Sequence, residues 1–197
     1  MSNLKTKSTK AAVLGLFTAI VVVLQMMSYF IKIGTFNLSL VLIPIVLAAV
    51  MYGPKYAGIL GGVFGAVVAV ATITGLDAGA FILFSASPVV TVLLCFVKGI
   101  AAGVVAGLIA RPLVDKNLYL AVILAAVAAP VVNTGIFIVA MFLFFREILA
   151  EWAAGADLLY FAIFGLVGIN FLIELLVNVV LSPVVLTVTR ALAKVRK

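Results

Sequence analysis

The sequence predicts an all-α integral membrane bundle of six transmembrane helices, built as one membrane domain over residues 1–197. Of these residues 67% are hydrophobic and only 10% are charged, whereas about a quarter of a soluble chain is normally charged. The apolar residues also come in blocks of about twenty, which at 1.5 Å per residue can cross a hydrocarbon layer about 30 Å thick. A lipid bilayer is therefore the expected environment of the chain.

Six apolar segments follow one another, at about residues 11–31, 38–52, 56–74, 87–110, 119–145 and 160–190. The breaks between them contain glycine, proline or charged residues, which end helices and avoid hydrocarbon. The first segment is too long for the apolar part of a secretory signal, so we expect a retained helix. Pro44, Pro130 and Pro183 lie inside segments, where each removes a backbone donor and is expected to kink or interrupt its helix.

Basic residues are distributed unevenly between the two sides of these segments. With the N-terminus inside, only Lys32 and Arg146 lie outside. The cytoplasmic basic residues are then Lys5, Lys7, Lys10, Lys55, Arg111, Lys116, Arg190, Lys194, Arg196 and Lys197. The positive-inside rule thus predicts cytoplasmic N- and C-termini. This topology explains the net charge of +7. We therefore expect the lipid bilayer as a partner and do not expect the chain to bind nucleic acid.

The sequence lacks the residues that most enzymes and metal sites need. There is no histidine, and Cys95 is the only cysteine. The usual zinc ligand and the commonest general base are therefore missing, as is any intramolecular disulfide. Neither a Gly-x-Ser-x-Gly nucleophile motif nor a phosphate-binding loop occurs. We expect no enzyme, no catalytic residue, no metal and no cofactor.

Three polar residues lie deep in apolar segments. Lys98, Asn133 and Glu174 are about twelve to fourteen residues into the fourth, fifth and sixth segments, near the expected bilayer midplane. A charge there is costly, so Lys98 and Glu174 should face the bundle interior and find each other, a backbone carbonyl or a ligand. A Lys98–Glu174 ion pair is the first hypothesis.

A polar stripe on the sixth segment extends this set. Asn170 and Asn178 lie one helical turn on either side of Glu174. The stripe fits two interpretations: an internal network that holds the last three helices together, or the floor of a pocket for a small polar solute. Asn37, Asp77 and Ser87, in or beside the outer loops, are expected to close such a pocket.

Small residues recur at four-residue spacing, which lets membrane helices approach closely. The stripes are Gly99, Gly103 and Gly107 in the fourth segment, Gly58 with Gly62 and Gly61 with Gly65 in the third, and Ala11, Gly15 and Ala19 in the first. We expect packing within the chain for the third and fourth segments. The stripe on the first segment, at the end of the bundle where the chain begins, is expected to meet a partner subunit.

In these features the chain resembles the substrate-binding S component of bacterial energy-coupling factor (ECF) vitamin transporters, over nearly its whole length. The resemblance rests on size, on six helices with both ends inside and on four local runs. These runs are Phe36-Asn37-Leu38-Ser39-Leu40 leading to Ile43-Pro44, Tyr52-Gly53-Pro54-Lys55, Val97-Lys98-Gly99, and Ile173-Glu174-Leu175 to Asn178.

The resemblance implies a multi-pass protein of the bacterial plasma membrane. Such proteins capture a water-soluble vitamin or related nutrient near the outer face; riboflavin, pantothenate, folate, cobalamin and others stay open here. It also implies a membrane coupling (T) subunit and two cytoplasmic ATPase subunits as partners. The family's Ala-x-x-x-Ala pattern for the coupling subunit corresponds to Ala11, Gly15 and Ala19, with glycine in the middle place.

Three rival interpretations remain. A cell-envelope scaffold of MreD type is similar in size and helix number but has no small-molecule ligand. An intramembrane enzyme would need the catalytic groups that the sequence lacks. A secondary transporter working alone usually shows internal repeats, and none is found in the sequence.

Overall fold

A computed structural model of the chain describes the backbone of residues 2–30, 32–33, 36–37 and 40–195, and the side chains of residues 12–30 and 40–191. The predicted all-α class is confirmed. The helices are α1 (Ser2–Ser28), α2 (Leu42–Tyr52), α3 (Pro54–Ile73), α4 (Ala78–Ala86), α5 (Pro88–Ala110), α6 (Leu118–Phe144), α7 (Arg146–Ala153), α8 (Leu158–Tyr160), the π-helix η1 (Phe161–Leu166), α9 (Gly168–Val180) and α10 (Ser182–Val195). Two short strands, β1 (Lys32–Ile33) and β2 (Phe36–Asn37), pair antiparallel between α1 and α2.

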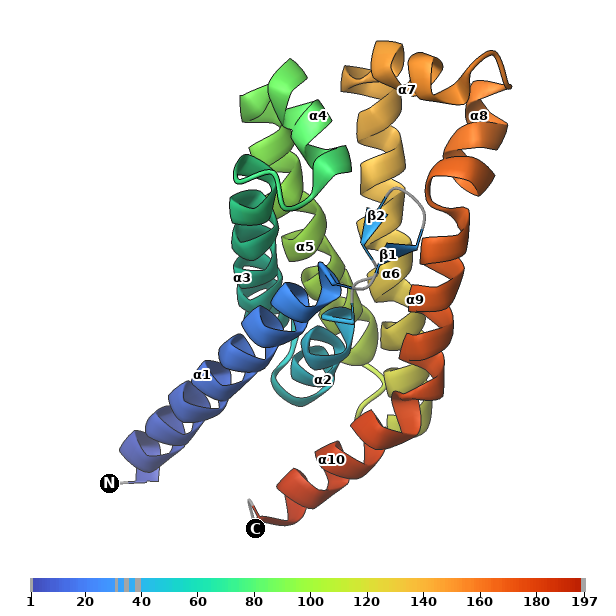
Figure 1. Ribbon diagram of the computed structural model, residues 1–197. Helices are drawn as coiled ribbons and strands as arrows, with labels where there is room; N and C mark the ends of the chain where they lie inside the picture. The colour runs from blue at the N-terminus through green and yellow to red at the C-terminus, as the bar shows by residue number, and fades with distance from the viewer. Residues whose placement is uncertain (1, 31, 34–35, 38–39, 196–197) are drawn as a thin grey trace.

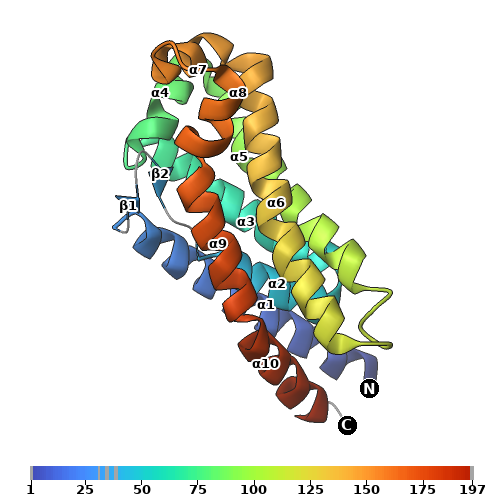
Figure 2. The same ribbon diagram turned by 90° about the vertical axis from the view of Figure 1, so that its right-hand side faces the viewer.

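The helices form an elongated bundle with two distinct ends (Figure 1). The start of α1 and the end of α10 lie at one end, whereas α4, α7 and α8 lie at the other (Figures 1 and 2). α5 packs between α3 and α6, and α9 packs along α6. The bundle therefore has one end that carries the chain termini and one end built from short helices.

By length and composition, fewer helices among the described residues qualify as membrane crossings than the six that the sequence predicts. In the described chain four helical stretches are long and apolar enough to cross: 54–73, 88–110, 118–144 and 168–191. The pair 146–153 and 158–166, bent by 92°, would be a fifth if counted as one span. The apolar helices 12–28 and 42–52 are shorter. The predicted count of six thus stays a prediction.

The sixth predicted segment, 160–190, is not one continuous helix in the structure. It divides into α8, η1, α9 and α10, because Val167 leaves helical geometry at φ −120° and ψ −12°, and Leu181 separates α9 from α10. Pro183 lies in the first turn of α10, where a missing backbone donor is tolerated. Pro130, by contrast, does not interrupt α6, which continues through it to Phe144.

Two apolar clusters hold the described part of the bundle together. The first joins α1, α2, α3, α5, α6 and α10 at the termini end, and the second joins α4, α5, α6, α7 and η1 at the other end. Between α3 and α5 the glycines allow backbone contact: a methyl group at Gly103 would overlap the carbonyl oxygen of Ala57, and one at Gly99 that of Gly61. This confirms that the third and fourth segments pack on each other.

Candidate functional site

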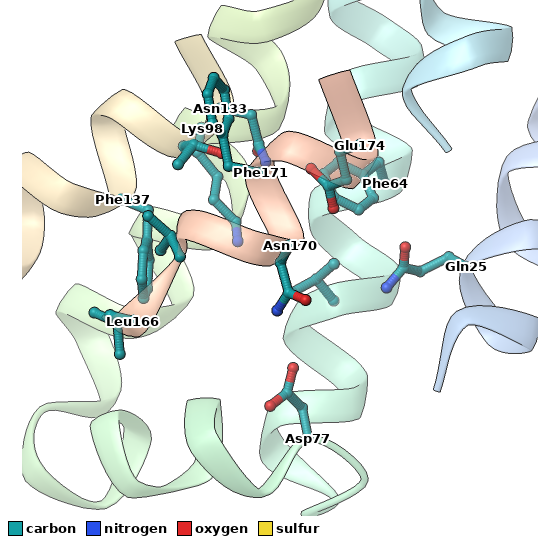
Figure 3. A pocket seen from close by; sticks show the side chains of 13 residues that line it. Gln25, Phe64, Asp77, Lys98, Asn133, Phe137, Leu166, Asn170, Phe171 and Glu174 are labelled. Atoms are coloured by element: carbon teal, nitrogen blue, oxygen red, sulfur yellow. The ribbon is translucent and has the colours of Figure 1, made fainter. Parts of the chain in front are cut away.

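A pocket of about 100 Å³ lies among α1, α3, α5, α6 and α9, next to the turn that leads into α4 (Figure 3). It borders both apolar clusters, since Phe64 belongs to one and Leu166 to the other. Its lining residues are Gln25, Phe64, Val68, Asp77, Lys98, Asn133, Thr134, Phe137, Leu166, Val167, Asn170, Phe171 and Glu174. Five of the predicted site residues thus come together here: Lys98, Asn133, Asn170, Glu174 and Asp77.

Asp77 is fixed in place by its role at the start of α4. Its Oδ1 accepts a hydrogen bond from the backbone N–H of Ala80 at 3.1 Å, which is the usual N-cap contact. The preceding turn contains Gly75 at φ +75°, a conformation that glycine adopts without strain. The Asp77 side chain is 8% exposed and points toward Asn170 (Figure 3). A buried carboxylate therefore forms one wall of the pocket.

Asn133 brings an unsatisfied hydrogen-bond acceptor to the pocket. It is 8% exposed, and its Oδ1 is buried without a hydrogen-bond partner. Pro130 lies one turn earlier in the same helix, and Phe137 one turn later. An unsatisfied buried amide costs about 1–3 kcal/mol. Asn133 is thus positioned to receive a donor from a bound molecule.

Lys98 does not form the predicted ion pair with Glu174 in the part of the chain that the structure describes. Its Nζ lies 5.5 Å from the centre of the Phe137 ring, over the ring face. An ammonium in this position is attracted by the ring's quadrupole, so the ring supplies part of the compensation expected from a carboxylate. Lys98 and Glu174 do line the same pocket. The two side chains therefore converge on one pocket, as expected, but without the predicted contact.

The polar stripe of α9 divides between the pocket and the packing below it. Asn170 and Glu174 line the pocket, and Glu174 is 7% exposed. Asn178 is absent from the lining; its Nδ2 donates to the carbonyl oxygen of Glu174 at 2.7 Å. The break before α9 brings Leu166 and Val167 into the lining beside the stripe. Irregular helical turns of this kind are frequent at functional sites.

The end of α1 supplies a further polar group to the pocket. Gln25 lines it, and its Nε2 donates to the hydroxyl of Tyr29 at 2.9 Å. Both side chains are buried. Their separation of four residues places them on one helix face, as the sequence indicates.

Two predicted site residues are not brought to the pocket by the described structure. Ser87 lies at the junction of α4 and α5 and is not among the lining residues. It precedes Lys98 by about three helical turns, or roughly 16 Å along α5. Asn37 pairs with Lys32 through its backbone, and its side chain lies outside the described residues.

The predicted partner stripe lies on α1. Gly15 and Ala19 are exposed, and nothing lies within 4 Å of a methyl group placed at Gly15. The side chain of Ala11 lies outside the described residues. The described part of the stripe is therefore not used for packing within the chain.

Sequence reasoning missed the aromatic part of the lining. Phe64, Phe137 and Phe171 all border the pocket. Two of them carried a signal, because Phe137 lies one turn after Asn133 and Phe171 directly follows Asn170. Phe64 had none, since its place depends on how α3 packs against α5.

These features define a membrane-embedded bundle with a small polar and aromatic pocket inside. Comparison with known families gives a more specific assignment: residues 9–186 match the family described as ECF transporter, substrate-specific component. The chain belongs to this family. It is therefore the substrate-specific component of a membrane transporter, a transport subunit rather than an enzyme. No individual curated protein matches it in addition.

Proposed function

We propose that the chain captures a water-soluble vitamin or related nutrient in this pocket and delivers it across a bacterial plasma membrane. The energy would come from an ATP-driven module made of a membrane coupling subunit and two cytoplasmic ATPases. Family membership supports a substrate and a transport module as partners. The observation that carries the proposal is the buried, unsatisfied Oδ1 of Asn133 at the pocket wall.

The lining suits a small polar solute. Lys98, Asn133 and Asn170 supply donors and acceptors, whereas Phe64 and Phe171 supply flat apolar surface. Binding sites for small molecules typically combine apolar walls with a few such polar groups. A solute that donates to Asn133 removes the cost of burying its amide unsatisfied. An internal clamp between helices would instead satisfy these groups with one another.

The charge distribution supports an outward position for the pocket. Lys55, Arg111 and Lys116 belong to the end of the bundle that carries the termini, whereas Arg146 belongs to the end with α4 and α7. Under the positive-inside rule the termini end is cytoplasmic. With α1, α2, α3, α5, α6 and α9–α10 as the six crossings, the turn at Asp77 faces outward. The pocket beneath it would then receive solutes from outside.

The test is to purify the protein from cells, extract it, and identify any small molecule that accompanies it by mass spectrometry. Thermal denaturation is then followed with a panel of vitamins. A ligand at 100 times its Kd should stabilise the protein by about 2.7 kcal/mol. Recovery without any small molecule, together with no thermal shift across the panel, would favour a ligand-free envelope scaffold of MreD type.

A further inference from the structure

The size and chemistry of the pocket point to a narrower class of substrate than the family as a whole. We propose, on the basis of the proposed function, that the substrate enters the pocket with one nitrogen-containing ring and presents a positively charged group to Asp77. Three features of the pocket support this substrate class: its volume, the charges that line it, and its aromatic rings.

The volume limits the buried part of the substrate to about one ring. The pocket measures about 100 Å³. An apolar cavity of about 150 Å³ holds benzene, whereas drug-sized ligands occupy roughly 300–1,000 Å³. A fused three-ring system would extend beyond this space. A single substituted ring is the largest group that the pocket encloses.

The charges favour a cationic group on that ring. Two carboxylates, Asp77 and Glu174, and one ammonium, Lys98, line the pocket. Lys98 already lies over the Phe137 ring. Asp77 is 8% exposed, and its carboxylate receives the Ala80 N–H but forms no ion pair with any described residue. A buried carboxylate needs compensation by charge or by several hydrogen bonds. An ammonium substituent on the substrate supplies both.

The remaining lining favours a flat ring beside that group. Phe64 and Phe171 offer aromatic surface against which a planar heterocycle packs in offset or edge-to-face geometry. Asn133 adds an acceptor with no protein donor. A ring with an amine substituent can pair with the Asp77 carboxylate. A second N–H or O–H group on the same ring can donate a hydrogen bond to Asn133 Oδ1. A carboxylate substituent beside Asp77 would instead face a like charge.

The first experiment compares three sets of compounds by thermal denaturation of the purified protein. The sets are single-ring amines such as pyridoxamine, acids such as nicotinate and pantothenate, and multi-ring compounds such as riboflavin and folate. We expect a single-ring amine to raise the melting temperature most. If a small molecule co-purifies with the protein, we expect it to be a single-ring amine as well. A preferred acid or multi-ring ligand overturns the substrate class but leaves the proposed function standing. Absence of any ligand overturns both.

The second experiment separates the charge of Asp77 from its structural role. Asp77→Asn keeps an N-cap of similar strength but removes the charge. We expect this variant to melt like the native protein and to bind the preferred amine roughly 10- to 100-fold more weakly, as expected for loss of a charge-assisted hydrogen bond. Binding of a matched alcohol, such as pyridoxine for pyridoxamine, should change less than about threefold.

Asp115→Asn is the control, because Asp115 is an exposed carboxylate in the loop between α5 and α6, at the termini end. It should alter neither ligand. Equal losses for amine and alcohol in Asp77→Asn, or no loss for the amine, would show that Asp77 does not recognise a positive charge.

Discussion

At the scale of single residues, Asn133 is the pocket residue whose burial carries a clear cost in stability. Asn133 places an amide oxygen without a partner inside the bundle, and an apolar side chain of similar size would avoid that cost. Nothing in the described packing of α6 requires an amide at this position. Its presence is accounted for by the proposed function, in which a bound molecule supplies the missing donor.

Asn133→Leu should therefore separate the two effects. We expect the ligand-free protein to be as stable as the native one, or up to about 2 kcal/mol more stable, while affinity for the natural ligand falls roughly 10-fold or more. Thermal denaturation and equilibrium binding measure the two quantities. Val139→Leu, on the exposed face of the same helix, should change neither. A destabilised Asn133→Leu variant with unchanged affinity would assign Asn133 to structure.

At the scale of elements, the contact between α3 and α5 forms the rigid wall of the pocket. Phe64 and Val68 of α3 and Lys98 of α5 are held in place because glycines let the two backbones touch. In lipid such close packing replaces the hydrophobic drive that is available in water. The glycines are thus part of what positions the site.

Gly103→Ala is expected to destabilise the bundle by about 1–3 kcal/mol or more, because the new methyl group meets the backbone of Ala57. Gly62→Ala is the matched control: its methyl group would lie 3.6 Å from a side-chain atom of Ile100, an ordinary contact. Denaturation of both variants in detergent gives the comparison. Equal stability of the two would mean that α3 and α5 do not approach as closely as described.

The exposed stripe of α1 has a different role from these glycines. Gly15→Leu with Ala19→Leu adds bulk where the chain itself has open space or an exposed surface. We expect unchanged folding and ligand binding but loss of association with the coupling module, measured by co-purification. Val23→Leu, at another exposed position of α1, serves as the control. Co-purification at the native level would remove the stripe from the partner interface.

At the scale of the whole molecule, transport depends on which end of the bundle faces the cytoplasm. The start of α1 and the end of α10 share one end of the bundle, and α4 lies at the other (Figure 1). The pocket is lined by Asp77, the N-cap residue of α4. The basic residues favour a cytoplasmic termini end. With this orientation the pocket would have the access to external solutes that the proposed function requires.

Cysteine labelling with a membrane-impermeant maleimide tests this orientation. Ala156→Cys, in the loop between α7 and α8, should react in intact cells, whereas Lys116→Cys, between α5 and α6, should react only after permeabilisation. The native Cys95 is 4% exposed and should contribute little background. The opposite pattern would place the pocket on the cytoplasmic side and contradict uptake from outside.

The sequence by itself determined the helical membrane class and five of the thirteen pocket residues. It could do so because a buried charge or amide in an apolar helix is costly and must face a shared interior. It could not fix contacts that depend on how helices pack. Lys98 lies over Phe137 and not against Glu174, and Ser87 lies outside the lining because α4 separates it from Asp77.

The tertiary structure alone decided the aromatic walls, the division of the last segment and the size of the pocket. Each depends on distances between residues far apart in the chain, such as Phe64 and Phe171, which no local pattern encodes. The sequence could show that certain polar groups must avoid lipid. Only the packed helices could show how much space those groups enclose, and therefore what kind of molecule fits.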